Sequence, residues 1–182
     1  MNKIQVKKTM IPISDYVTVK KEISLVEVLQ SLEQTRKSDI DHAHRDAIVV
    51  DENGVFIGKI TMLDVFRILE PNYRKVAQNQ GTGTLTAEFV MRAAEDFNLW
   101  LEPTKTICER GKRLTVADVM HIPEEAEYIN ETDTLEKAMH LYVMGVHQPL
   151  IVKNADGKVT GVLRFGDVFE SVRQRLLDVS CS

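Results

Sequence analysis

An internal repeat constrains the fold of this chain more than any other feature. Residues 54–66 read GVFIGKITMLDVF and residues 157–169 read GKVTGVLRFGDVF, with five of the 13 positions identical at a constant offset of 103. Upstream, a Val-x-x-x-Met beginning at Val6 matches one beginning at Val116, at an offset of 110. The two offsets differ by seven, so the first copy carries seven extra residues, which fall in its charged segment RKSDIDHAHRD. Two copies of one unit therefore organise the chain.

Local patterns predict the same β-α-β-β-α order in each copy. A short strand (16–19; 127–129) precedes a helix, and Ser24 with Glu27 forms a capping box at the start of the first helix. Apolar residues then recur at helical spacing. A second strand, a tight turn and a third strand follow as a hairpin. In the first copy we expect the second strand at AIVV (47–50), the turn at DENG (51–54) and the start of the last helix at Met62. In the second copy the same elements are expected at LIV (150–152), NADG (154–157) and Phe165.

The duplication also predicts how the copies associate. A single unit of about 60 residues buries little apolar surface. We therefore expect an α+β fold in which the two repeats pack into one pseudo-twofold module, with equivalent clefts between them. The expected boundaries are 5–69 for repeat 1, 70–113 for a helical insert and 114–177 for repeat 2.

The insert begins with a polar, glycine-containing loop and continues with a helix that Thr86 can cap. We expect Pro103 to end this helix and Gly111 to end a short second one. Its apolar stripe either packs on the module or forms a dimer or partner surface. The stripe comprises Phe89, Val90, Ala93, Ala94, Phe97 and Leu101.

Composition excludes several classes of protein. The net charge of −4 and the pI of about 5.8 argue against nucleic acid as a partner. No segment approaches the roughly 18–20 apolar residues of a membrane span, and the first residues lack the apolar core of a secretory signal. The cysteines, Cys108 and Cys181, have no paired spacing. We therefore expect a cytoplasmic protein that binds neither nucleic acid nor membrane.

The chain lacks the common catalytic motifs. It contains no nucleophile elbow, P-loop or HExxH sequence. His42-x-His44 offers two histidines without a third ligand, which is weak evidence for a metal. The sequence therefore predicts no catalytic residue and no metal site, and we do not expect an enzyme.

The chain resembles the CBS domain in its doubled TM/VM start (9–10 and 119–120), its β-α-β-β-α order, its xVVD-x-x-G turn and its G-x-[ILV]-x-x-x-D-[VI] ending, and two such units in tandem resemble a CBS pair, or Bateman module. The resemblance implies regulation rather than catalysis. It further implies that an adenosine-containing ligand binds between the repeats. AMP, ADP and ATP are the favoured ligands, and S-adenosylmethionine is less favoured. The resemblance also implies a homodimer that acts on a separate, unidentified protein.

The resemblance assigns ligand contacts to the third strand and last helix of each repeat. Thr61 and Asp64 complete the family pattern in repeat 1, where the aspartate would bind ribose hydroxyls. The alternative is that Thr-x-x-Asp only caps the helix. In repeat 2, Asp167 is retained but Arg164 replaces the usual Thr or Ser. Arg164 either clamps a phosphate or fills the cleft, so the two sites need not be equivalent.

The remaining candidates also come from the family pattern. His44 and His147 match at the offset of 103, just before a strand, where basic side chains can contact phosphate. Val19, Ile129 and Pro149 are candidates for an apolar adenine slot. For each of these the alternative is an ordinary loop or core residue.

The sequence thus predicts a regulatory CBS pair that senses an adenine nucleotide. The alternative is a ligand-free dimerisation scaffold that docks a partner through its helical insert. The Arg164 substitution and the seven extra residues favour this alternative modestly.

Overall fold

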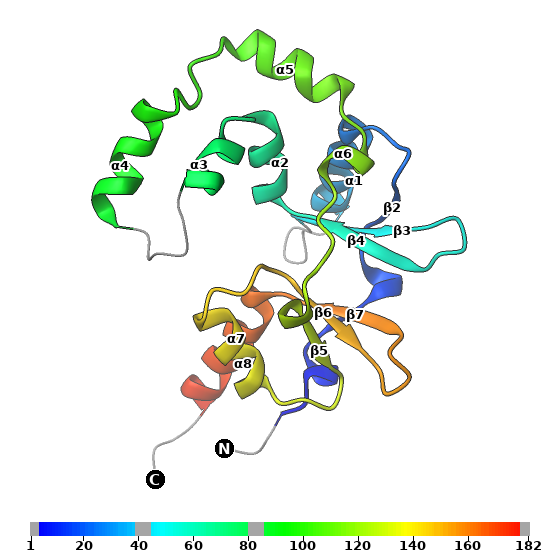
Figure 1. Ribbon diagram of the computed structural model, residues 1–182. Helices are drawn as coiled ribbons and strands as arrows, with labels where there is room; N and C mark the ends of the chain where they lie inside the picture. The colour runs from blue at the N-terminus through cyan, green and yellow to red at the C-terminus, as the bar shows by residue number, and fades with distance from the viewer. Residues whose placement is uncertain (1–3, 39–44, 80–85, 179–182) are drawn as a thin grey trace.

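The computed structural model describes residues 4–38, 45–79 and 86–178 of the chain. Two small sheets, each with its own helices, form two lobes that stack on one another (Figure 1). Both copies have the predicted β-α-β-β-α order, so the α+β fold of two repeats is confirmed. Within the described residues, no helix has the length and apolar character needed to cross a membrane.

The first lobe contains the sheet β2-β3-β4. Strand β2 runs parallel to β3, and β3 pairs with β4 as the predicted antiparallel hairpin. Gly54 has a φ of +77° in the connecting turn, which explains a glycine there. The elements are β2 (Thr18–Lys20), α1 (Leu25–Ser38), β3 (Ala47–Val50), β4 (Phe56–Ile60) and α2 (Met62–Leu69).

The second lobe repeats this arrangement with one additional strand. Its sheet has the order β1-β7-β6-β5, with β5 parallel to β6 and β7 antiparallel to β6. The elements are β5 (Tyr128–Asn130), α7 (Leu135–Val143), β6 (Leu150–Lys153), β7 (Val159–Leu163) and α8 (Phe165–Asp178), and the additional strand is β1 (Ile11–Pro12).

The leading segment of each repeat, which comes before strand β2 or β5, packs on the other repeat. Figure 1 shows the dark-blue N-terminal segment beside the orange strands β6 and β7. The backbone N–H of Val6, in the 3-10 helix η1 (Val6–Lys8), donates to the carbonyl of Asp133 at 2.8 Å, and Ile11 of β1 pairs with Val162. A second 3-10 helix, η2 (Ile13–Asp15), leads from β1 towards β2. The sequence match did not indicate this crossing.

The leading segment of repeat 2 makes the reciprocal crossing. The N–H of Val116, in α6 (Val116–Val119), donates to the carbonyl of Ile23 at 2.9 Å, and His121 pairs with Lys59 of β4 through bonds of 2.9 and 2.8 Å. The 3-10 helix η3 (Glu125–Glu127) then leads into β5. Each repeat is thus completed by the leading segment of the other.

Alternate residues of the hairpin strands face two different cores. Ala47 and Val49 of β3 pack against the helices of their own lobe, whereas Ile48 joins a core shared by both lobes. Its equivalent Ile151 lies in that shared core. The strands are buried on both faces and read as continuous apolar runs for this reason.

The insert wraps around the α2 side of the first lobe (Figure 1). It contains α3 (Tyr73–Asn79), α4 (Ala87–Asp96) and α5 (Thr104–Arg113). Thr86 caps α4 as predicted, accepting from the N–H of Phe89 at 3.1 Å.

The predicted ends of the insert helices were wrong. Helix α4 ends at Asp96, because Asn98 and Trp100 adopt positive φ values of 53° and 59°. Pro103 instead precedes α5, and Gly111 lies inside that helix. Buried Glu70 lies at the end of α2, and its carboxylate, which accepts from the N–H of Trp100 at 2.7 Å, holds this turn against that end of α2.

Candidate functional site

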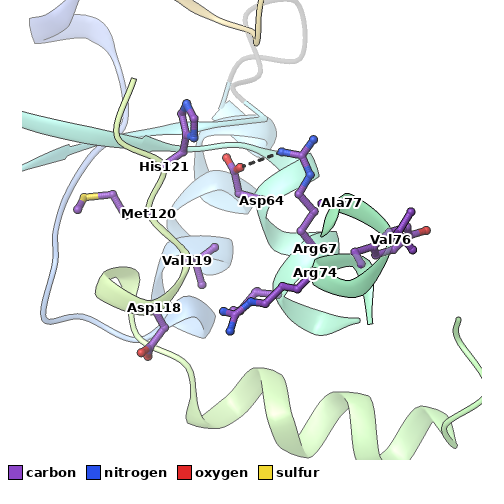
Figure 2. Close-up of a pocket in the computed structure, with 11 residues that line it drawn as sticks. Asp64, Arg67, Arg74, Val76, Ala77, Asp118, Val119, Met120 and His121 are labelled. Atoms are coloured by element: carbon purple, nitrogen blue, oxygen red, sulfur yellow. Dashed lines mark ion pairs between the residues drawn. The ribbon is translucent and has the colours of Figure 1, made fainter. Parts of the chain in front are cut away.

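Two neighbouring cavities lie where repeat 1 meets the leading segment of repeat 2. The first has a volume of about 490 Å³ and is lined by α2, α3 and residues 118–121 (Figure 2). The second, of about 740 Å³, lies between the lobes, with Thr61 on one wall and His147 on another. Arg67 and His121 line both cavities, so the two form adjoining parts of one site.

Asp64 lies at the start of α2 and serves as its cap. Its Oδ2 accepts from the N–H of Thr61 at 2.9 Å and from the hydroxyl of Thr61 at 2.6 Å. Its Oδ1 is 3.9 Å from Arg67 and 3.8 Å from His147, both beyond hydrogen-bond distance. One oxygen therefore caps the helix while the other keeps acceptor capacity at the cavity wall.

Two arginines add positive charge to the first cavity. Arg67 lies one turn after Asp64 on α2, and Arg74 projects from α3 on the same side (Figure 2). Apolar lining comes from Ile68, Val119 and Met120. A cavity with one carboxylate, two guanidinium groups and an apolar wall suits a ligand with hydroxyl, anionic and apolar parts.

A buried ion pair lies beside the second cavity. The ammonium of Lys59, whose side chain is fully buried, is 2.6 Å from Glu127 Oε2. It also donates to the carbonyls of His147 at 3.0 Å and Pro149 at 2.7 Å. These three acceptors match the three protons of an ammonium group.

The pair shifts both pKa values. Burial lowers the pKa of Lys59, although Glu127 opposes this effect. Burial alone would raise the pKa of Glu127, but hydrogen bonds from Lys59, from the N–H of Glu124 and from His121 lower it to about 2. Glu127 is therefore a carboxylate at neutral pH.

Two histidines complete this cluster. His121 Nε2 lies 2.7 Å from Glu127 Oε1, and the rings of His121 and His147 are 4.5 Å apart. Neither ring nitrogen of His147 has a hydrogen-bond partner among the described residues, although both are buried. Burial, followed by the charge of Lys59, lowers the pKa of His147.

The equivalent position in repeat 2 has different chemistry. Arg164 Nε and Nη2 donate to Asp167 at 2.8 and 2.7 Å, so both carboxylate oxygens are engaged. The hydrogen bonds to Asp167 raise the pKa of Arg164. Nearby, the buried hydroxyl of Tyr16 donates to Asp46, and burial raises the pKa of Tyr16. The equivalent positions of the two repeats therefore differ in their chemistry.

The other predicted ligand contacts lie in several places. Val19 and Ile129 are buried in the cores of the first and second lobe respectively. Pro149 is buried, and its carbonyl accepts from Lys59. His147 lines the second cavity. His44, like His42, lies outside the described residues.

Sequence reasoning missed several residues of the site, namely Lys59, Arg67, Arg74, His121 and Glu127. One signal was available for Lys59, because it interrupts an apolar strand where the other copy has Val162. Arg67, three residues after Asp64, also lies on the same helix face.

The model of the CBS domain family matches residues 6–71 and 116–174, which together are more than half of the chain. No curated protein matches in sequence. Among solved structures, the CBS-pair protein CBSX2 from Arabidopsis thaliana is 18% identical, with a TM-score of 0.60 over 98% of this chain and 100% of that one.

Two further structures contain ligands. CBSX2 in complex with AMP is 20% identical, with a TM-score of 0.55 over 94% of this chain and 98% of that one. The CBS domain of a bacterial CNNM/CorC family Mg²⁺ transporter in complex with ATP is 18% identical, with a TM-score of 0.54 over 93% of this chain and 87% of that one. The order of elements, the paired repeats and both family matches agree, and the chain therefore belongs to the CBS domain family as a tandem pair.

Proposed function

We propose that this CBS pair is a regulatory module that binds an adenine nucleotide between its repeats, on the side of Asp64. The observation that carries the proposal is Oδ1 of Asp64, which accepts no hydrogen bond from the described residues and lies at the wall of a cavity that also presents Arg67 and Arg74. The AMP and ATP complexes of CBS proteins with this fold support an adenosine ligand.

Each part of the nucleotide has a chemical partner in this proposal. Asp64 accepts hydrogen bonds from the ribose hydroxyls, with Thr61 holding its carboxylate in place. Arg67 and Arg74 bind phosphate oxygens. The base packs against the apolar wall formed by Ile68, Val119 and Met120 rather than against the core residues Val19 and Ile129.

The proposal assigns one nucleotide to each chain. Arg164 already donates to both oxygens of Asp167, so a ribose at this position would compete with a guanidinium for the carboxylate. A ligand in the Asp64 cleft would contact α2 of repeat 1 and the leading segment of repeat 2. It would therefore change how the two repeats meet. The regulated protein, and a homodimer through which it is regulated, belong to the same proposal.

Thermal unfolding with AMP, ADP, ATP and S-adenosylmethionine tests the proposal, with GMP as the matched control. A ligand at 100 times its Kd stabilises the folded state by about 2.7 kcal/mol. We expect at least one adenosine compound, and not GMP, to raise the melting temperature in this way. Equal melting temperatures with all five compounds and with buffer would refute nucleotide sensing.

A second candidate function is a scaffold that docks a partner through its insert. Large apolar side chains are exposed on α4 and after it, with Met91 76% and Leu101 73% accessible. This candidate predicts that Met91→Ser/Leu101→Ser lowers the oligomeric state measured by light scattering. An unchanged mass for this variant would count against dimerisation through the insert.

A further inference from the structure

Three side chains capable of binding a metal meet beside the cavities described above. They are His121, which follows α6, Glu127 at the end of η3, and His147, which precedes β6. One ligand atom from each lies within 4.8 Å of the other two. All three residues line the 740 Å³ cavity.

His147 provides an independent indication of a missing ligand. An imidazole ring always carries at least one N–H group, and a buried donor without an acceptor costs about 1–3 kcal/mol. Its Nδ1 is 3.5 Å from Glu127 and its Nε2 is 3.8 Å from Asp64, with no hydrogen bond formed by either nitrogen among the described residues. A metal on one ring nitrogen, with the other donating to a carboxylate, would satisfy both.

The ion pairs around the cluster leave its donor atoms accessible to a metal. Lys59 balances Glu127, and Arg67, 3.9 Å from Asp64 Oδ1, balances Asp64. Lys59 approaches Oε2 of Glu127, while Oε1 faces His121 at 2.7 Å. One oxygen of Glu127 can therefore keep its ion pair while the other turns to a metal.

We propose that His121, Glu127 and His147 form a binding site for a divalent transition-metal ion of the zinc type. Two imidazoles and one carboxylate match the donor set of three-ligand zinc sites that keep a fourth position open. Magnesium and calcium prefer sites built from oxygen ligands, so they suit this cluster poorly. The open position faces the cavity between the lobes.

The site would stiffen the junction of the repeats. His121 pairs through its backbone with Lys59 of repeat 1, whereas His147 belongs to repeat 2. A metal that joins their side chains would fix the segment that also lines both cavities. This proposal does not require nucleotide binding.

Calorimetric titration of the chelator-treated, nucleotide-free full chain with ZnCl₂ tests the site, together with the visible spectrum after CoCl₂ addition. We expect one Zn²⁺ per chain and a four-coordinate Co²⁺ spectrum. His147→Gln and His121→Gln should each weaken Zn²⁺ binding at least ~100-fold, because the loss of even an outer-shell partner costs 10–100-fold.

Two matched variants serve as controls. His140→Gln removes an exposed histidine of α7, and His42→Gln/His44→Gln removes the His-x-His pair of the sequence. Both should bind Zn²⁺ as the parent chain does. Absence of Zn²⁺ binding by the parent, undiminished binding by His147→Gln, or loss of binding in either control would overturn the proposal. If His147→Gln does not fold by circular dichroism, the result with His121→Gln decides.

Discussion

Lys59 of β4 and Glu127 of η3 form a buried ion pair that joins the two repeats, with 2.6 Å between Nζ and Oε2. The exposed fractions of their side chains are 0% and 5%. Repeat 2 has fully buried Val162 at the position of Lys59. The pair therefore breaks the symmetry of the repeats beside the place where His121 pairs with β4.

Removing one member of this pair should be costly. Glu127→Gln leaves the ammonium of Lys59 buried without its counter-charge, and breaking such a pair typically costs about 3–5 kcal/mol. We expect a loss of this size in the free energy of unfolding, measured by urea denaturation. Replacing both residues, as Lys59→Met/Glu127→Gln, should restore much of the loss. A change below about 1 kcal/mol for the single variant, as for an exposed pair, would contradict this view of the pair.

Acidification should destabilise the fold in two stages. The pKa of His147 is lowered in the folded state, so the unfolded chain binds the proton more tightly and stability falls as the pH drops below the unfolded value of 6.5. The pKa of Glu127 falls from 4.5 to about 2, so its contribution is present above pH 4.5 and is lost towards pH 2.

Urea denaturation of the metal-free chain at a series of pH values measures both stages. His147→Gln should flatten the dependence between pH 7 and pH 5, whereas the exposed substitution His140→Gln should not change it. A parent chain with constant stability between pH 7 and pH 5 would contradict the assignment to His147.

The glycines at the crossing segments should tolerate no side chain. A Cβ on Gly161 of β7 would lie 2.6 Å from the carbonyl oxygen of Ile11, where β1 pairs with β7. Gly161→Ala should therefore cost about 1–3 kcal/mol, as overpacking does. Gly166→Ala is the control, since nothing lies within 4 Å of its Cβ and alanine in a helix is more stable by up to about 1 kcal/mol. Equal unfolding free energies for the two variants would argue against the crossing.

The elements of each repeat could be predicted because their signals are local. The Ser24–Glu27 capping box begins α1, and Gly54 and Gly157 both adopt a φ of 77° in their turns. The crossing of the leading segments could not be predicted in this way. The repeat pairs Val6 with Val116 as equivalents, but it does not say which sheet either segment joins, because that depends on long-range contacts.

The site was predictable only in part for the same reason. Thr61 and Asp64 follow a short motif, and the structure brings them to a cavity wall. His121, Glu127 and His147 follow no recognisable spacing, and only the fold brings them together. The turn that follows α4 is held by the hydrogen bond between Trp100 and Glu70, which lie 30 residues apart in the sequence. The local sequence pattern of α4 therefore could not indicate where this helix ends.

The two aspartates at equivalent positions should differ in their effect on nucleotide binding. Asp64→Asn should weaken it roughly 10- to 100-fold, because a hydrogen bond to a charged group contributes about 1.5–3 kcal/mol. Asp167→Asn should leave the affinity unchanged, since Arg164 already occupies that carboxylate. Calorimetry with the adenosine compound that gives the largest thermal shift measures both. Equal losses in the two variants would argue against a single occupied cleft.

Replacing Arg164 should open the second cleft. Arg164→Thr removes the guanidinium that holds both oxygens of Asp167 and creates the Thr-x-x-Asp arrangement by which Thr61 and Asp64 cap α2. We expect the stoichiometry in calorimetry to rise from one nucleotide per chain towards two, with the first affinity unchanged. Arg173→Thr is the matched control, because Arg173 forms a similar pair with Glu170 on an exposed part of the same helix. If the Arg164 variant still binds one nucleotide, the ion pair with Asp167 is not what closes that cleft.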